Sequence, residues 1–362
     1  MSASNPFRML GYVGADVPGA AQFISEDRLE EFKSPMRNRI DWITIAELTD
    51  RLKQLRNDIS AFRRPGDLGK MSLPGAQAKT AFYRDEQTSR WGVPLGRTPT
   101  THIVKPCVPG FDGLVENEHF CQDLAARIGL PAAKSQVLAL DETYIVIERY
   151  DRLPTDNAES PMTRVHQEDM CQALGLMPAK KYQEEGGPGI PAIAAIIRRA
   201  STEPEADIDR FVEANVFNWL IGGTDAHAKN YSLLISAGDE VRLAPLYDLS
   251  SQLPYVDRIS QKLAMKIGEH YEIAGIGIDD WKNLAAAIGM DTDRLLGMIK
   301  EMLEKIPDAI SATRDQALSD GLDQEVVTRL AALLHEHVIN RLATIETITY
   351  PRARATQRRI SD

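Results

Sequence analysis

A chain of 362 residues that is 43% hydrophobic and 26% charged can bury a substantial core, divided over about two lobes. The formal net charge of -10 and the pI of about 5.3 argue against autonomous binding to nucleic acid, because phosphate neutralisation needs clustered Lys and Arg. Three scattered cysteines argue against a disulfide framework or a thiolate zinc site, and no basic leader or apolar run of about 18 residues occurs, so we expect a cytoplasmic protein without membrane contact.

The first part of the chain is dominated by patterns typical of strands. After a predicted helix at 45–57, we expect strands at 80–83 and 102–105, the second ended by Pro106. A helix at 115–128 is closed by Gly129, and two further strands follow at 135–140 and 144–150. We find no chemical motif in the first 60 residues.

Periodic apolar helices prevail in the second part. The pattern predicts helices at 168–176, 190–200 and 208–221, and again from residue 281 to the end. A strand-rich front followed by a helix-rich rear predicts an α+β protein with two lobes that meet near residues 148–151. We therefore divide the chain into a β-rich N-lobe, residues 1–151, and a helical C-lobe, residues 152–362.

The most informative segment is the polar loop at 224–230, which follows an apolar helix and Gly222-Gly223 and precedes a strand-like run at 231–235. Four residues separate Asp225 from Asn230, which is the spacing of the Asp and Asn in the protein-kinase catalytic loop. This spacing predicts that Asp225 reaches a substrate hydroxyl while the amide oxygen of Asn230 turns toward a magnesium ion on nucleotide phosphates.

A second carboxylate, Asp248, follows an apolar strand and lies between Tyr247 and Leu249. Because Mg²⁺ takes oxygen ligands, we expect Asp248 to be its second protein ligand beside Asn230.

Lys105 lies in a hydrophobic strand, where an unpaired ammonium group would be costly to bury. In a kinase its partners are the α- and β-phosphates of ATP and a helix carboxylate, for which Glu118 is the first choice and Glu116 the alternative. Upstream, the loop at 72–80 contains Gly75 and Lys79 and could wrap phosphate through backbone N–H groups.

The run at 145–151 leaves the first lobe and enters the second. In kinases such a hinge offers its backbone to the adenine edge, so we expect Glu148 and Tyr150 to contact adenine through their main chains. We also assign to the ATP site Arg149, which lies between these two residues, and Lys229 and Tyr247, which precede Asn230 and Asp248.

The sequence that contains these residues resembles the HipA family of bacterial serine/threonine toxin kinases. The resemblance covers nearly the whole chain from Asn5 onward, with its strongest strings in order at SLPGAQAKT (72–80), TPTTHIVK (98–105), ERYDR (148–152), QEDMCQ (167–172), GGPGI (186–190), TDAHAKN (224–230) and PLYD (245–248).

The resemblance implies roles for individual residues of this chain. Asp225 would be the catalytic base, and Asn230 and Asp248 would hold Mg²⁺. The ATP contacts would come from Lys105, from His227 and from the loop of Pro74, Gly75, Ala76, Gln77, Ala78 and Lys79. Ser72 matches the position whose autophosphorylation switches these kinases off, since a phosphate there adds about two negative charges beside ATP.

The resemblance also implies partners. Family substrates are aminoacyl-tRNA synthetases, and the usual partner is a small helix-turn-helix, HipB-like antitoxin that binds operator DNA, so that any DNA contact of this chain would be indirect. Longer members begin with a further small β-rich subdomain that we expect this chain to lack. Some short relatives receive it as a separate small protein, so inhibition by antitoxin, by a supplied subdomain or by Ser72 autophosphorylation all stay open.

Two other classes remain alternatives. A non-catalytic co-repressor could use an ATP-shaped pocket for stability alone, although it would have no need for Lys105, Asp225, Asn230 and Asp248 together. A kinase acting on small molecules would keep the same site, and only the identity of the phosphorylated product would separate it from a protein kinase.

Overall fold

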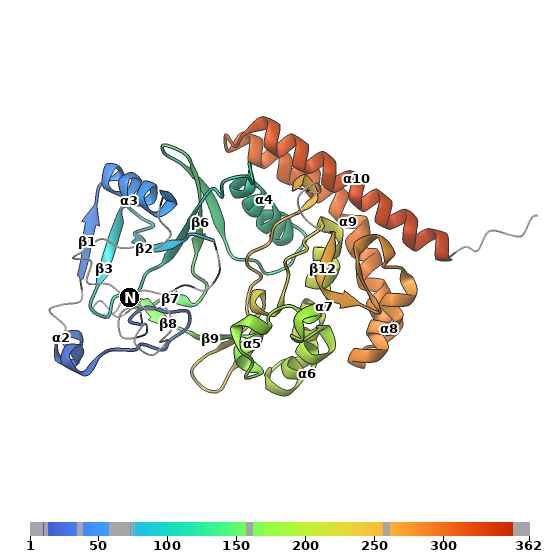
Figure 1. Ribbon diagram of the computed structural model, residues 1–362, viewed down its shortest axis with the longest axis horizontal. Coiled ribbons are helices and arrows are strands. Elements are labelled where there is room, and N and C mark those ends of the chain that lie inside the picture. Colours follow the sequence, from blue (N-terminus) through green and yellow to red (C-terminus); the bar gives the residue numbers. More distant parts are fainter. Residues whose placement is uncertain are drawn as a thin grey trace, which may run out of the picture.

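The computed structural model describes residues 10, 14–34, 39–57, 73, 75, 77–156, 162–255 and 261–349. Within them a β-rich half and a helical half lie side by side (Figure 1), which confirms the predicted α+β class. Ser72, Pro74 and Ala76, which we assigned to the phosphate loop and its phosphorylation site, lie outside the described residues.

The β-rich half is built on an antiparallel sheet with the strand order β1-β3-β2-β4-β6-β5. The strands are β1 (Arg39–Ile43), β2 (Thr80–Arg84), β3 (Trp91–Leu95), β4 (His102–Pro106), β5 (Ser135–Ala139) and β6 (Thr143–Glu148). The four strands that we predicted at 80–83, 102–105, 135–140 and 144–150 are thus confirmed as β2, β4, β5 and β6, with small shifts at their ends.

Two helices cover the two faces of this sheet. On one face, α3 (Ile45–Asn57) packs Leu48 and Leu52 against Val104 and its neighbours. On the other face lies α4 (Leu114–Arg127), the helix that we predicted at 115–128. Because successive side chains of a strand point to opposite faces, Val104 faces α3 whereas Lys105 faces α4.

The helical half surrounds a continuous apolar core. Its helices are α5 (Met170–Ala173), α6 (Ile190–Ala200), α7 (Pro204–Ile221), α8 (Ile278–Ile288), α9 (Thr292–Ser319) and α10 (Gln324–Thr349). The predicted helix at 208–221 begins earlier, at Pro204, because proline is well accommodated in a first helical turn. Phe120 and Leu124 of α4 also belong to this core, so α4 joins the two halves of the molecule (Figure 1).

The predicted helix at 168–176 is wrong at its start. Residues His166–Asp169 form a strand, β9, that pairs antiparallel with β10 (Ser232–Ile235), and only α5 is helical. A capping box ends the strand, because the Asp169 carboxylate accepts from the Gln172 amide at 2.9 Å and the Gln172 side chain accepts from the Asp169 amide at 2.9 Å. The β9-β10 pairing overrides the helical periodicity here.

The remaining elements are short. They are η1 (Glu26–Arg28), α2 (Leu29–Lys33), β7 (Arg152–Pro154), β8 (Met162–Arg164), η4 (Pro178–Lys180), η5 (Gln183–Glu185), η6 (Ala228–Asn230), β11 (Val241–Leu243), η7 (Leu253–Tyr255), β12 (Lys262–Ile267), β13 (His270–Glu272) and η8 (Ile273–Gly275). In the part of the chain that the structure describes, no helix is long and apolar enough to cross a membrane.

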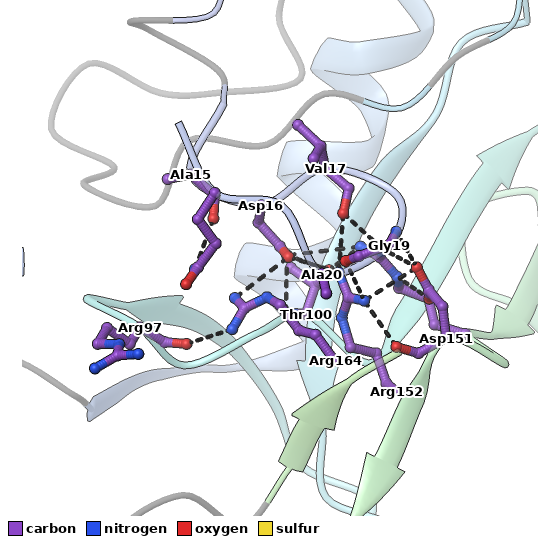
Figure 2. Close-up of polar contacts among 12 residues, drawn as sticks. Ala15, Asp16, Val17, Gly19, Ala20, Arg97, Thr100, Asp151, Arg152 and Arg164 are labelled. Atoms are coloured by element: carbon purple, nitrogen blue, oxygen red, sulfur yellow. Dashed lines mark hydrogen bonds and ion pairs between the residues drawn. The ribbon is translucent and has the colours of Figure 1, made fainter. Parts of the chain in front are cut away.

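An ionic network ties the N-terminal segment to the junction of the two halves (Figure 2). Asp16 binds Arg152 at 2.9 Å and lies 3.6 Å from Arg149, and the amide of Gly19 donates to Asp151 at 2.7 Å. We call residues 15–19 the N-terminal clasp. The sequence showed no motif in this region, because the arginine partners of Asp16 lie more than a hundred positions away along the chain.

Candidate active site

A buried lysine joins the sheet to the helical half. Lys105 Nζ on β4 donates to Glu118 Oε1 on α4 at 2.7 Å and also to the Asp248 carboxylate. Lys105 and Glu118 are only 4% and 5% exposed, whereas the Asp248 side chain is 38% exposed. Of the two carboxylates that we considered as partners, Glu118 and not Glu116 contacts the ammonium group.

The charges of this cluster reinforce one another. Burial alone would lower the pKa of Lys105, but the carboxylates of Asp248 and Glu118 outweigh it and raise that pKa. Burial likewise opposes ionisation of Asp248, yet the ammonium groups of Lys105 and Lys79 hold its pKa at about 2. Lys79, in turn, has a lowered pKa because it is buried and because Lys105 repels it. Two cations beside an ionised carboxylate are therefore ready to bind phosphate.

The segment that carries Asp248 is fixed from both sides. Asn117 of α4 donates to the Ser251 carbonyl at 2.8 Å and accepts from the Ser251 amide at 2.8 Å. Tyr247 Oη donates to the Lys229 carbonyl at 2.7 Å. Because Tyr247 and Lys229 are the chain neighbours of Asp248 and Asn230, this bond brings the Asp248 segment against the end of the loop at 224–230.

That loop begins where α7 ends, at Gly222 in the left-handed conformation with φ 65°. Asn230 Nδ2 donates to the Asp225 carbonyl at 3.0 Å and closes the loop across the spacing noted in the sequence. Lys229 forms an ion pair with Asp169, so the capping residue of α5 also holds this loop. Asp225 is exposed to solvent, so its carboxylate can be reached from outside the loop.

His227 is buried in the same loop, at 5% exposure. Its Nε2 lies 2.9 Å from Lys181 Nζ, and because an ammonium group can only donate, Nε2 accepts and the ring proton is on Nδ1. Burial lowers the pKa of His227, which keeps the ring neutral. Among the described residues Nδ1 has no hydrogen-bond partner, so this buried donor is available for a ligand oxygen.

The predicted adenine hinge lies at the end of β6. Here the amide of Glu148 donates to the Lys134 carbonyl at 2.9 Å and the amide of Arg149 donates to the Thr101 carbonyl at 2.9 Å. The Arg149 guanidinium lies in the ionic network of the N-terminal clasp. Tyr150 packs against Tyr247 with ring centroids 5.7 Å apart. Adenine contacts at this hinge stay a prediction. They would use backbone groups other than the amides of Glu148 and Arg149, which already donate within the protein.

The predicted phosphate loop, residues 72–80, is described only in part. Gln77 donates through Nε2 to the Pro106 carbonyl at 3.2 Å, which holds the loop to the end of β4. A Cβ at Gly75 would collide with Lys79 Nζ, so the glycine backbone and the lysine side chain lie against each other. Ala78 follows and leads into β2.

The donor groups present fit ATP and Mg²⁺. Asn230 uses Nδ2 within the protein, which turns its amide oxygen to the other side, and Asp248 is ionised and partly exposed. An amide oxygen and a carboxylate are hard ligands of the kind that Mg²⁺ prefers. Lys79, Lys105 and Nδ1 of His227 are complementary to phosphate oxygens.

Sequence reasoning missed Lys181 and Tyr182. Tyr182 Oη donates to Asp225 Oδ1 at 2.6 Å, and its ring meets that of His227 edge-on at 5.0 Å. Both residues precede the string GGPGI, which we singled out only as part of the resemblance. The glycine pair in that string was the one available signal that the preceding backbone is folded tightly.

The buried Lys105 of the sheet pairs with Glu118 of a helix, and the helical half that faces the sheet carries Asp225, Asn230 and Asp248. This arrangement defines a protein-kinase-like architecture. The family model described as the HipA-like C-terminal domain matches residues 71–310. The chain belongs to this HipA-like family.

Two relatives illustrate the family. The Sinorhizobium fredii protein Y4mE, provisionally named as a kinase, is 33% identical over 91% of this chain and 77% of its own length. The serine/threonine-protein kinase toxin HipA of Shewanella oneidensis is 27% identical over 86% of this chain and 71% of its own.

A solved structure shows the same fold. The chain matches the structure of the Shewanella oneidensis toxin-antitoxin complex of HipA, HipB and operator DNA with a TM-score of 0.81. The match covers 96% of this chain and 81% of that one at 24% sequence identity. It establishes the HipA kinase-like fold.

Proposed function

We propose that this chain is an ATP- and Mg²⁺-dependent serine/threonine protein kinase that acts as the toxin of a HipA-type toxin-antitoxin system. The observation that carries the proposal is the ion cluster of Lys105, Glu118 and Asp248, fixed through Tyr247 against the loop of Asp225 and Asn230. A non-catalytic ATP-binding module has no use for an exposed carboxylate at Asp225 beside that cluster.

Residues 1–151 form the N-lobe in this proposal and residues 152–362 the C-lobe, with ATP between them. Lys105, Lys79 and His227 bind phosphate oxygens, and Asn230 and Asp248 would hold Mg²⁺, which would supply neutralisation of the phosphate charge. Asp225 orients the substrate hydroxyl and accepts its proton late in the transfer. Catalysis is mainly positioning and charge neutralisation.

The proposed protein substrate is an aminoacyl-tRNA synthetase, whose phosphorylation would stop translation and growth, and the proposed autophosphorylation site is Ser72. The Shewanella HipA structure contains HipB and operator DNA. By analogy we propose a helix-turn-helix antitoxin as the partner here, with DNA contacted through it.

The test is transfer of labelled phosphate from ATP with Mg²⁺ by the wild-type chain and the Asp225→Gln variant. The rate of transfer should fall at least about 100-fold in the variant, because the base is lost, while ATP affinity measured by calorimetry stays near that of the wild type. Asp315→Gln, at an exposed position of α9, is the matched control and should keep full activity. Full transfer by Asp225→Gln would remove the proposed role of this carboxylate.

Mass spectrometry of the products separates the protein kinase from a small-molecule kinase. Phosphate on Ser72 or on an added synthetase supports a protein kinase, whereas label found only on small molecules contradicts it.

A further inference from the structure

The segment at 178–187 lies directly against the catalytic loop. The Ala228 amide donates to the Lys181 carbonyl at 3.2 Å, which joins the two backbones. From this segment Tyr182 reaches Asp225 and Lys181 reaches His227, at 2.6 Å and 2.9 Å. Two neighbouring side chains therefore contact the two residues of the loop that we assign to the acceptor hydroxyl and to ATP.

The glycines that follow explain the shape of this segment. The Gly187 amide donates to the Tyr182 carbonyl at 2.9 Å, and a Cβ at Gly187 would lie 2.7 Å from that carbonyl oxygen. Only glycine permits this approach. Lys180 Nζ donates to the Glu185 carbonyl at 2.8 Å and fixes the same turn from outside. The turn presents Lys181 and Tyr182 on the side of the catalytic loop.

We infer that Tyr182 and Lys181 are positioning residues of the phosphotransfer site: Tyr182 holds the Asp225 carboxylate in its reactive orientation, and Lys181 fixes the His227 tautomer that binds ATP. The inference rests on the proposed function and deepens it.

The chemistry of the two contacts differs. Burial and the bond to Asp225 raise the pKa of Tyr182, so its hydroxyl stays protonated and donates to Oδ1. Oδ2 is then the oxygen that faces the acceptor hydroxyl. Lys181 donates to Nε2 of His227, which leaves the proton on Nδ1, the buried donor without a partner among the described residues. Tyr182 thus serves the transfer step, and Lys181 serves nucleotide binding.

The experiment measures self-phosphorylation of the full chain against ATP concentration in Tyr182→Phe and Lys181→Met. Tyr182→Phe should lower the limiting rate on the order of tenfold at an unchanged half-saturating ATP concentration, because it removes one hydrogen bond to a charged group. Lys181→Met should raise the half-saturating ATP concentration about threefold to tenfold with a smaller change in rate. A purely structural role of the segment would not divide the two parameters in this way.

Tyr144→Phe is the matched control, because Tyr144 Oη also donates to an aspartate carboxylate, Asp141 at 3.1 Å, and packs in the core under α3. It should leave both parameters unchanged. A Tyr182→Phe variant as fast as the wild type, or faster, would overturn the positioning role, and Lys181→Met tests the segment independently should Tyr182→Phe fail to fold. If the wild type itself transfers no phosphate, the proposed function fails and the inference with it.

Discussion

At the scale of single residues, Lys105 combines a structural role with the phosphate-binding role that we propose for it. Its ammonium group is almost completely buried, and two carboxylates from different halves of the molecule offset the cost of removing it from water. Burial disfavours the ionised form of Glu118 and raises its pKa, although the neighbouring lysine acts to lower it. The pair is stable only as a pair.

Lys105→Met should therefore reduce both stability and ATP affinity. The free energy of unfolding should fall by about 3 kcal/mol, because Glu118 and Asp248 lose their buried counter-charge. Adding Glu118→Gln should recover part of that stability, since it removes one unpaired carboxylate, but should not recover ATP binding. Urea unfolding and calorimetric titration with ATP check the two effects. A single variant that binds ATP as tightly as the wild type would exclude Lys105 from the phosphate site.

At the scale of elements, the N-terminal clasp fixes the junction of the two halves (Figure 2). Asp16 also accepts from the Thr100 amide and hydroxyl, at 2.9 Å and 2.7 Å, and lies 3.4 Å from Arg164. Burial acts to raise the pKa of Asp16, but the guanidinium groups, Arg149 first among them, lower it to about 2. The clasp is thereby bound to β8 and to the hinge that follows β6.

The lowered pKa of Asp16 makes stability depend on pH with a defined sign. Because its pKa in the folded state, about 2, is below its ordinary value of 3.8, the contribution is complete above about pH 4 and is lost as pH falls through about 2. The difference corresponds to about 2 kcal/mol of unfolding free energy. Denaturant unfolding of the wild type between pH 5 and 2, roughly the range over which such a carboxylate titrates, should show this loss.

Asp16→Asn should remove that pH dependence and lower the free energy of unfolding by about 3 kcal/mol at neutral pH, because buried arginines lose a counter-charge. Asp123→Asn is the matched control, since Asp123 pairs with Arg127 at 3.1 Å on the surface of α4, where an ion pair contributes about 0.5 kcal/mol. Equal effects of the two substitutions would show that the clasp does not stabilise the junction.

At the scale of the whole molecule, the proposed nucleotide site uses residues from both halves. Lys79 and Lys105 come from the sheet, Glu118 from the helix that joins the halves, and Asn230 and Asp248 from the helical side. A ligand that binds the folded chain and not the unfolded chain stabilises the fold by an amount that rises with the logarithm of its concentration relative to its Kd.

ATP with Mg²⁺ at about 100 times its Kd should raise the free energy of unfolding by about 2.7 kcal/mol. An excess of EDTA should remove most of this increment, because phosphate charge beside Asp248 is then uncompensated. Asp248→Asn should be stabilised much less by added Mg²⁺, whereas Asp315→Gln should respond as the wild type does. Thermal unfolding with each ligand measures the increments. A wild type that is equally stable with and without ATP would contradict a nucleotide site at this junction.

Much of the fold was predictable because it follows from local periodicity. The β-prone runs of β4 and β6 and the apolar helical patterns of α3, α6 and α7 are properties of short segments, so their limits were close to those observed. The strand β9 was not predictable in this way, because its hydrogen bonds are made with β10, some sixty positions later in the chain. Pairing between distant strands decided that region.

The spacing of Asp225 and Asn230, the burial expected of Lys105 and the position of Asp248 after a strand are properties of the sequence alone, since each depends on chemistry within a few neighbouring residues. The tertiary structure decided that Glu118 pairs with Lys105, that Tyr182 reaches Asp225 and that Asp16 closes the hinge. Thirteen positions separate Glu118 from Lys105, whereas the other two contacts join residues 43 and 136 positions apart, and folding determines which of several possible polar partners come within a hydrogen bond of each other.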